Sequence, residues 1–119
     1  MARRALHLLR RDDIDVAQLY DGFSLITVSW LESLGFCGRG EAGAFLEGGT
    51  RIALDGELPL NTSGGQLAAG RLHGLGLLHE ACLQLRGQAD GRQVVDPHVA
   101  VVATGGLPNM ACLLLTRAG

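Results

Sequence analysis

The sequence predicts an α/β domain with a small mixed sheet. Three short segments rich in apolar residues, 14–20, 98–104 and 110–116, are typical of strands. Two longer apolar segments, 24–34 and 72–86, are typical of helices and lie between the first two strands. Strands joined through helices usually run parallel, whereas strands joined by a short turn pair antiparallel. We therefore expect a parallel pair of strands with an antiparallel last strand.

One further helix is expected before the first strand. Apolar residues at helical spacing predict a helix over residues 2–10. In the strand expected over residues 14–20, alternate side chains would point to opposite sides. The helix that follows has Ser24 or Asp21 as its candidate N-cap, and Gly35 fits its C-terminal end.

The middle of the chain is rich in glycine. Residues 36–60 are expected to form a long irregular segment, with a small hairpin-like excursion over 53–59. Residues 61–74 are punctuated by glycines and lead into a helix that is expected to run from Leu72 to about Arg86. Glycines at such close intervals let the backbone approach a ligand or another backbone.

Composition excludes several classes of function. The chain has 119 residues, a length typical of one domain, and its net charge of −2 gives no basic field for nucleic acid. No apolar run reaches the roughly 20 residues of a membrane span. The cysteines number 3, and none forms a Cys-x-x-Cys pair, which argues against zinc and favours a reduced, cytoplasmic setting.

Several motifs resemble the thiolase superfamily. Residues 61–65 (NTSGG) and 70–74 (GRLHG) resemble the loop that presents the catalytic histidine in that family. Residues 34–41 (LGFCGRGE) and 13–23 (DIDVAQLYDGF) are similar to segments of its sterol-carrier or lipid-transfer branch. Residues 101–106 (VVATGG) stand where thiolases carry Cys-x-Gly. The resemblance implies a partial thiolase-fold C-terminal domain over residues 1–119, since full thiolases are about three times longer.

Two departures from the family pattern bear on the chemistry. Arg71 stands at the position of the family's catalytic histidine, and Ala103 stands at that of its Cys-x-Gly cysteine. An arginine stays protonated at neutral pH, so Arg71 cannot serve as a base. The nucleophilic cysteine of thiolases belongs to their N-terminal half, which this chain does not resemble. We therefore expect retro-aldol chemistry rather than thiolysis.

The resemblance also implies a set of site residues. Tyr20 matches a tyrosine linked to proton transfer in retro-aldol cleavage of steroid side-chain acyl-CoA, and His73 matches the histidine of a Tyr-x-His-Gly motif in aldolase-like relatives. We take Tyr20, His73 and Asp21 as candidate catalytic residues. The candidate substrate-binding residues are Arg71, Asn61, Gly64, Gly65, Gly105 and Gly106. Leu67, Leu72 and Leu75 are available to line an acyl tail.

Each of these residues also has a purely structural interpretation. Tyr20 could equally be a buried tyrosine whose hydroxyl makes one hydrogen bond. Arg71 could equally be a solvated charge on the surface. His73 is equally typical of a capping or packing residue.

The resemblance implies binding of, or reaction on, a coenzyme A thioester, with no tightly bound cofactor and no metal. The first function expected is carbon–carbon bond chemistry on an acyl-CoA within a larger assembly. The alternative is a non-catalytic acyl-CoA-binding, lipid-binding or interface subunit. Thiolase-fold proteins dimerise, so a homodimer or a partner chain is expected. We expect the isolated chain to be inactive in thiolysis.

Overall fold

The computed structural model describes residues 10–119, and its sheet has the predicted mixed topology. The strands are β1 (Val16–Leu19), β2 (Val99–Gly106) and β3 (Asn109–Thr116), in the order β1-β2-β3. β1 pairs parallel with β2, with Val16 opposite Ala100. β2 pairs antiparallel with β3, so the expected hairpin is confirmed. The helix expected over residues 2–10 falls on residues 1–9, which lie outside the described part, and on Arg10, which has extended backbone.

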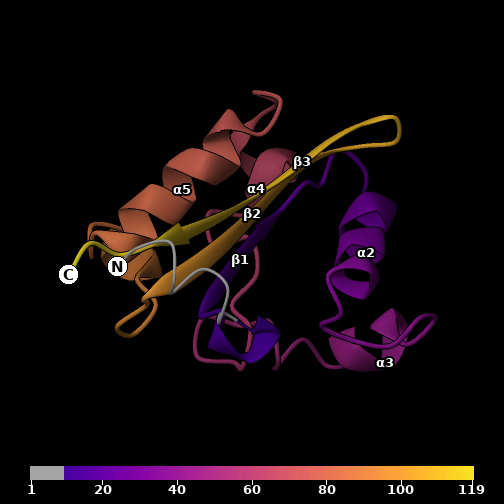
Figure 1. Cartoon of the computed structure of the whole chain (residues 1–119), viewed down its shortest axis with the longest axis horizontal. Coiled ribbons are helices and arrows are strands. Elements are labelled where there is room, and N and C mark those ends of the chain that lie inside the picture. Colours follow the sequence, from indigo (N-terminus) through magenta and orange to yellow (C-terminus); the bar gives the residue numbers. More distant parts are fainter. Residues whose placement is uncertain (1–9) are drawn as a thin grey trace.

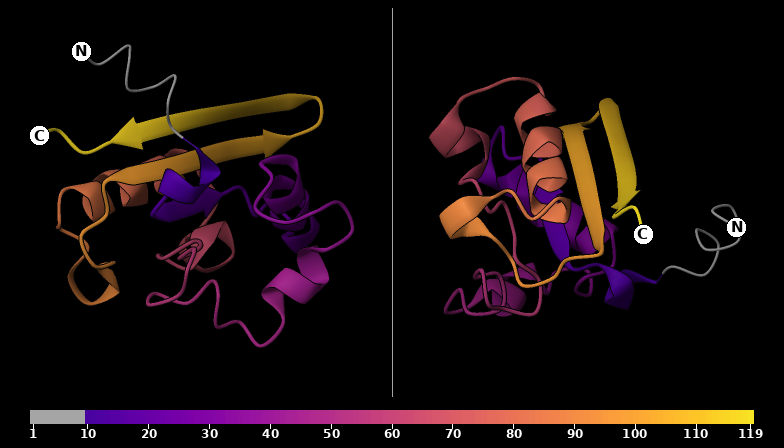
Figure 2. Two further views of the ribbon diagram at one scale, coloured as in Figure 1. Left: turned by 60° about the horizontal axis from the view of Figure 1, so that its bottom comes forward. Right: turned by 90° about the vertical axis from the view of Figure 1, so that its left-hand side faces the viewer.

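The helices lie on both sides of the sheet. They are α2 (Ser24–Ser33), α3 (Ala42–Leu46), α4 (Gly65–Ala69) and α5 (Leu75–Leu85), with short 3-10 turns η1 (Arg11–Asp13) and η2 (Asp90–Arg92). Figures 1 and 2 show α5 along one side of the strands and α2 with α3 on the other. Leu77, Ala81 and Leu85 form the buried face of α5. Among the described residues, no helix has the length and apolar character needed to cross a membrane.

Three expectations about the helices are corrected. α5 begins at Leu75 rather than Leu72, because Gly74 has a left-handed backbone (φ 95°) that interrupts the helix before it. α3 forms within residues 36–60, which were expected to be irregular, and α4 forms within the glycine-rich residues 61–74, where no separate helix was expected. α3 forms because Ala42 and Phe45 bury apolar side chains, which outweighs the poor helix propensity of the glycines around them.

β1 is buried on both faces, and its free edge is covered. All four of its residues are buried. The edge that faces away from β2 is paired with residues 59–61: the Ala17 N–H donates to the Pro59 carbonyl at 2.9 Å. The Asn61 N–H in turn donates to the Ala17 carbonyl at 2.9 Å. The segment before the glycine-rich loop therefore acts as an extra partner for β1.

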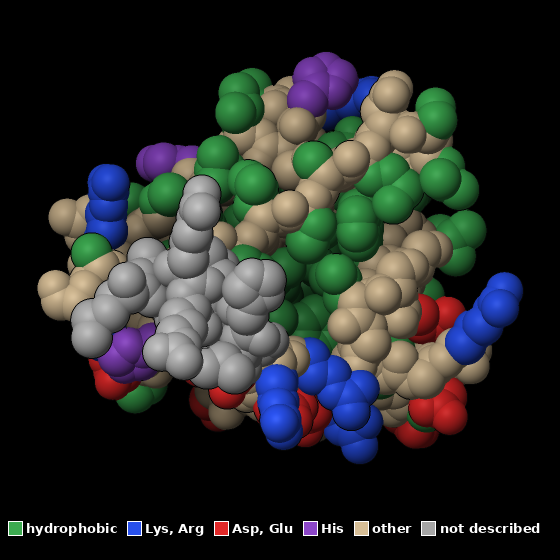
Figure 3. Space-filling model, in the orientation of Figure 1, with side chains coloured by type: hydrophobic (Ala, Val, Ile, Leu, Met, Phe, Trp, Pro, Cys, Tyr) green, Lys and Arg blue, Asp and Glu red, His purple; other side chains and the backbone are tan. Residues whose placement is uncertain are grey.

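β3 differs from β1 because its side chains are mostly exposed. Met110, Leu113 and Leu114 are 50%, 46% and 41% exposed. In Figure 3, hydrophobic side chains gather across the middle of the face shown, over the hairpin and toward α2. An exposed edge strand with this composition is a template for pairing or packing with another protein surface.

Candidate active site at the carboxyl end of β1

The carboxyl end of β1, the loop between α4 and α5, and the end of β2 surround one hollow. Its volume is about 380 Å³, and its lining residues are Tyr20, Arg71, His73, Thr104, Gly105, Gly106 and Asn109. Carboxyl ends of parallel strands are the usual place for ligands in α/β folds. Five of the nine candidate residues thus line the same hollow, although they are up to 86 positions apart (106 − 20).

Tyr20 is held by its main chain at the floor of this hollow. Its N–H donates to the Ala103 carbonyl at 2.8 Å, and its carbonyl accepts from the Thr27 hydroxyl at 3.0 Å. Its side chain is 8% exposed. A Cβ at Gly22 would lie 2.5 Å from the Tyr20 ring, so the glycine there leaves room for the phenol. The main chain of Tyr20 is therefore held by β2 and α2, and Gly22 lies directly against its ring.

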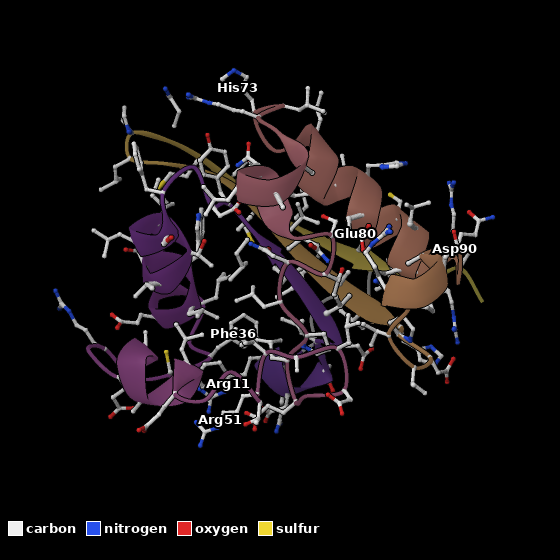
Figure 4. The ribbon with its side chains drawn as sticks, turned by 180° about the vertical axis from the view of Figure 1, so that it is seen from behind. Arg11, Phe36, Arg51, His73, Glu80 and Asp90 are labelled. Atoms are coloured by element: carbon white, nitrogen blue, oxygen red, sulfur yellow. The ribbon has the colours of Figure 1, made fainter. Side chains whose placement is uncertain are left out.

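His73 and Arg71 belong to the loop between α4 and α5. His73 has φ 50°, a left-handed conformation that is uncommon for a residue with a Cβ. Gly74, which follows, packs so closely on Thr104 of β2 that a Cβ would collide with the threonine methyl. Figure 4 shows His73 at the outer end of this loop, far along the molecule from Glu80. Both His73 and Arg71 are exposed, so they lie at the mouth of the hollow rather than in its floor.

Asp21 has a different environment from the one expected of a proton donor. It is 5% exposed, and its Oδ1 accepts from the Gln66 N–H at 2.9 Å while its Oδ2 accepts from the Leu67 N–H at 3.2 Å. These are free N–H groups in the first turn of α4, where a carboxylate is favoured. Asp21 therefore joins the end of β1 to the start of α4. It is not an N-cap of α2, whose N-cap is Phe23, without a side-chain cap.

Asn61 is bonded to the main chain of β1. Its Oδ1 accepts from the Leu19 N–H at 2.7 Å, and its Nδ2 donates to the Leu19 carbonyl at 2.9 Å. The side chain thus pairs with the strand residue that precedes Tyr20. Asn61 is absent from the lining of the hollow, as are Gly64 and Gly65.

The glycines of the 61–65 segment and those at the end of β2 have different structural roles. Gly65 has φ 67°, and a Cβ there would collide with the Asp21 carboxylate. Gly105 has φ 74°, and its carbonyl accepts from the Trp30 indole N–H at 3.0 Å. Gly106 lines the hollow and also faces Ile26 of α2. Only the second pair is placed beside a ligand-sized space.

An apolar groove continues from the hollow along α2. Tyr20, Arg71 and Gly106 also line a second hollow with Phe23 and Ile26. Ile26 and Gly106 in turn line a third, which is lined by Ser29, Trp30, Ser33, Leu107 and Met110 as well. Sequence reasoning missed this groove, because its walls come from α2 and from the hairpin turn, which only the fold brings together. The expected acyl-tail residues Leu67, Leu72 and Leu75 are 67%, 59% and 67% exposed and line none of these three hollows.

The thiols of Cys37 and Cys112 lack the environment of a nucleophile. Burial raises the pKa of Cys37, and the carboxylates of Glu32 and Glu41 raise it further. Burial also raises the pKa of Cys112. A nucleophilic thiol needs the opposite shift. Within residues 10–119, no cluster of three or more His, Cys, Asp or Glu residues could hold a metal ion.

Comparison with known proteins identifies the family. Residues 2–116 match the family described as Thiolase C-terminal domain-like. The chain belongs to this family. The expected fold class and thiolase resemblance are therefore confirmed.

The similar proteins also confirm the expected branch. Over 102 residues the chain is 42% identical to the 17-hydroxy-3-oxo-4-pregnene-20-carboxyl-CoA lyase of Mycobacterium tuberculosis, covering 86% of this chain and 26% of the relative. Over 106 residues it is 39% identical to the steroid side-chain-cleaving aldolase of Thermomonospora curvata, covering 89% of this chain and 27% of the relative. It is 38% identical over 114 residues to sterol carrier protein 2 of Oryctolagus cuniculus, covering 93% and 21%.

A solved structure has the same fold. The structure named Ltp2-ChsH2(DUF35) aldolase superposes with a TM-score of 0.86 at 37% identity, covering 97% of this chain and 30% of that chain. The chain thus spans about a quarter of the length of the curated relatives.

Proposed function

We propose that the chain, as one domain over residues 1–119, provides part of the acyl-CoA site of a steroid side-chain aldolase that works as a larger assembly. The observation that carries this proposal is the meeting of Tyr20, Arg71 and His73 around one hollow. It is supported by similarity to two proteins, one named as a lyase of a pregnene carboxyl-CoA and the other as a steroid side-chain-cleaving aldolase.

The proposed reaction is a retro-aldol cleavage. A base takes the proton of the β-hydroxyl group, the bond between the α and β carbons breaks, and a ketone leaves. The electron pair of that bond forms the enolate of the thioester, which then takes a proton at the α carbon. Tyr20 and His73 are our candidates for these two proton transfers, since both line the hollow.

Asp21 is not proposed to transfer a proton. Its two carboxylate oxygens accept hydrogen bonds from the N–H groups of Gln66 and Leu67. Both oxygens are thus engaged by the main chain of α4, and Asp21 does not line the hollow. We therefore propose that Asp21 supports catalysis by fixing the end of β1 beside Tyr20. Asn61, Gly64 and Gly65 support the site in the same way, through the backbone of the loop.

Arg71 is proposed to hold an anionic group of the coenzyme A thioester. It lies at the open side of the hollow, where a guanidinium can make charge-assisted hydrogen bonds to a phosphate or carboxylate. Gly105 and Gly106 would allow the thioester to lie against the backbone of β2. No tightly bound cofactor is part of this proposal.

The acyl group is proposed to lie in the apolar groove along α2. Ile26, Trp30 and Met110 give this groove an apolar lining, and it joins the hollow at Gly106. A ligand with an anionic end near Arg71 and a bulky apolar end near Trp30 would match the two regions in turn. Steroid acyl thioesters have this character.

Thiolysis is excluded from the proposal. Arg71 and Ala103 replace the histidine and cysteine that the thiolase resemblance would require. The raised pKa values of the thiols of Cys37 and Cys112 offer no substitute. Purified protein should therefore leave a 3-ketoacyl-CoA uncleaved in the presence of coenzyme A.

The exposed face of β3 is proposed to pack against further protein, either a second copy or a partner chain. Met110, Leu113 and Leu114 leave apolar surface there. A similar solved structure is named as an assembly of Ltp2 with ChsH2. We also propose a cytoplasmic, reducing location, because Cys37, Cys82 and Cys112 are free.

A non-catalytic role is the second candidate. It is favoured by the similarity to sterol carrier protein 2, whose name describes a carrier rather than a cleaving enzyme. In that case the hollow and groove would bind an acyl-CoA or lipid without cleaving it.

The function is tested by titrating the protein with a 17-hydroxy steroid C20-carboxyl-CoA thioester, acetyl-CoA and free coenzyme A. The chain has one tryptophan, Trp30, which lines the apolar groove and reports binding by fluorescence. We expect the steroid thioester to change the emission at the lowest concentration. Mass spectrometry of the same samples, with and without the partner chain, separates cleavage from binding alone. Unchanged emission with every ligand would refute the proposed site.

A further inference from the structure

Glu80 is a buried carboxylate that the proposed chemistry does not use. It lies on α5 and is 2% exposed, and Figure 4 shows it well away from His73. Its carboxylate contacts Thr62, in the segment that precedes α4. A buried charge is costly unless it is paired and hydrogen-bonded. Its partners therefore show which parts of the chain it holds together.

Four polar groups surround the Glu80 carboxylate. Its Oε1 accepts from the Thr62 hydroxyl at 2.7 Å and from Gln84 Nε2 at 3.1 Å. Arg92 donates from Nε to Oε1 at 3.2 Å and from Nη2 to Oε2 at 2.9 Å. Burial alone would raise the pKa of Glu80, but the bonds from Arg92, Thr62 and Gln84 and the charge of Arg92 lower it below its usual value. Glu80 is thus an ionised acceptor at neutral pH.

Thr62 connects this cluster to β1. Its hydroxyl donates to Glu80 and accepts from Gln18 Nε2 at 2.8 Å and from Gln84 Nε2 at 3.2 Å. A hydroxyl has one donor and two acceptor positions, so all three are used. The direction of every bond is fixed as a result, because Glu80 can only accept and the two amide nitrogens can only donate.

The cluster is attached to the candidate site through the neighbours of Thr62. Asn61 precedes it and bonds both main-chain groups of Leu19, the residue before Tyr20. Gly65 follows three positions later and packs against Asp21, which holds the first turn of α4. Moving Thr62 would therefore move both supports of the Tyr20–Asp21 segment.

We propose that Thr62 and Glu80 are positioning residues, which hold the loop of residues 61–65 against β1 and so fix Tyr20 beside Arg71 and His73. What the site binds rests on the function proposed above, but the positioning itself does not. Replacing a buried ion pair by apolar residues often leaves stability unchanged, whereas hydrogen bonds that use every position of the Thr62 hydroxyl and both oxygens of Glu80 favour one geometry. Positioning predicts an effect at the site beyond any loss of stability.

Hydrogen exchange at single amides tests the proposal without a ligand. Thr62→Val keeps the shape of the side chain and removes the hydroxyl, whereas Thr62→Ser keeps the hydroxyl and is the matched control. Exchange is followed by NMR at the amides of Leu19, Gln66 and Leu67, whose N–H groups bond Asn61 and Asp21. We expect Thr62→Val to raise their exchange rates about tenfold more than those of β2 amides, and Thr62→Ser to leave them near the parent values.

A second control separates positioning from general destabilisation. Leu85→Ala removes buried apolar contacts at the C-terminal end of α5, away from the hollow, and should lower the melting temperature without a selective change at these amides. If Thr62→Val raises exchange by the same factor everywhere, as Leu85→Ala does, the positioning role is wrong. Should Thr62→Val fail to fold, Glu80→Gln serves instead. It places an amide donor opposite Arg92 Nη2, and we expect the same selective change at smaller size.

Ligand affinity gives an independent second readout. For the steroid acyl-CoA thioester, we expect Thr62→Val to weaken binding about tenfold at a temperature where every variant is folded, with Thr62→Ser and Leu85→Ala near the parent. Equal affinity for Thr62→Val and the parent would contradict positioning of the binding site. If the parent itself does not bind, the proposed function fails, while the exchange result still decides the role of Thr62 and Glu80.

Discussion

The carboxyl end of β1 and the outer face of β3 are built on opposite principles. At the end of β1, the side chains of Asn61 and Asp21 each make two hydrogen bonds to main-chain groups, and both are largely buried or half-buried. Along β3, only Leu115 is half-buried and the other residues are exposed. One region is completed by contacts inside the described chain, whereas the other presents apolar side chains to solvent.

The difference indicates which properties each region determines. Satisfied buried polar groups fix a geometry, and losing one partner costs the desolvation of the other. Exposed apolar side chains contribute little to the fold, but they favour association with another surface. Variants at the end of β1 should therefore change stability and the site, and variants on β3 should change assembly.

Gly65→Ala is expected to cause the largest loss of stability. Its φ of 67° disfavours a side chain, and the new Cβ would collide with the Asp21 carboxylate, which must then leave the N–H groups of α4. We expect the free energy of unfolding to fall by about 3 kcal/mol, measured by urea denaturation. Gly43→Ala is the control, because a Cβ there meets nothing within 4 Å in α3. It should be neutral or slightly stabilising. An equal effect of both variants would contradict the interpretation of Asp21.

The contribution of Glu80 to the free energy of unfolding should depend on pH. Its pKa is lowered in the folded protein, so the folded state releases this proton more readily than the unfolded state. The resulting stability is present above the unfolded-state pKa of about 4.3 and is lost as the pH falls through the lower folded-state value. Denaturation curves between pH 6 and 3 should therefore fall less steeply below about pH 4.3 in Glu80→Gln than in the parent. Parallel curves would show that the carboxylate gains nothing from its partners.

Leu113→Lys is expected to have the smallest effect on the fold and a clear effect on assembly. Leu113 is 46% exposed on β3, so the free energy of unfolding should change by less than about 0.5 kcal/mol. Sedimentation should show a dimer or larger species for the parent and weaker association for the variant. Val95→Lys is the control, because Val95 is 91% exposed and lies outside β3. A parent that stays monomeric at micromolar concentration would contradict self-association through β3 and leave a partner chain as the occupant of this face.

The strands and their pairing could be predicted from the sequence, whereas α3, α4 and the start of α5 could not. Apolar runs bounded by turn residues gave the three strands and the hairpin. Gly64 and Gly65 argue against a helix by propensity, but Asp21 supplies acceptors for the first N–H groups of α4 and makes a short helix possible. That support comes from a residue 45 positions away, and no local pattern contains it.

The candidate site could be predicted only in part, because it too depends on contacts between residues far apart in the sequence. Resemblance to a family pointed to Tyr20, Arg71 and His73, and the fold brings them around one hollow. It also pointed to Asn61, whose bonds to Leu19 span 42 positions and turn its amide toward β1. The apolar groove was missed, because Trp30 and Met110 come from separate elements that meet only in the folded chain.

Calorimetric titration of Arg71→Ala with the steroid acyl-CoA thioester is the most direct test of the proposed site. Arg39→Ala is the matched control, because Arg39 is an exposed arginine that does not line the hollow. Losing a charge-assisted hydrogen bond costs about 1.5–3 kcal/mol, so we predict that Arg71→Ala binds about ten- to a hundredfold more weakly than the parent. Arg39→Ala should bind as the parent does. Equal affinities for the parent and Arg71→Ala, with the fold intact, would contradict an acyl-CoA site at the end of β1.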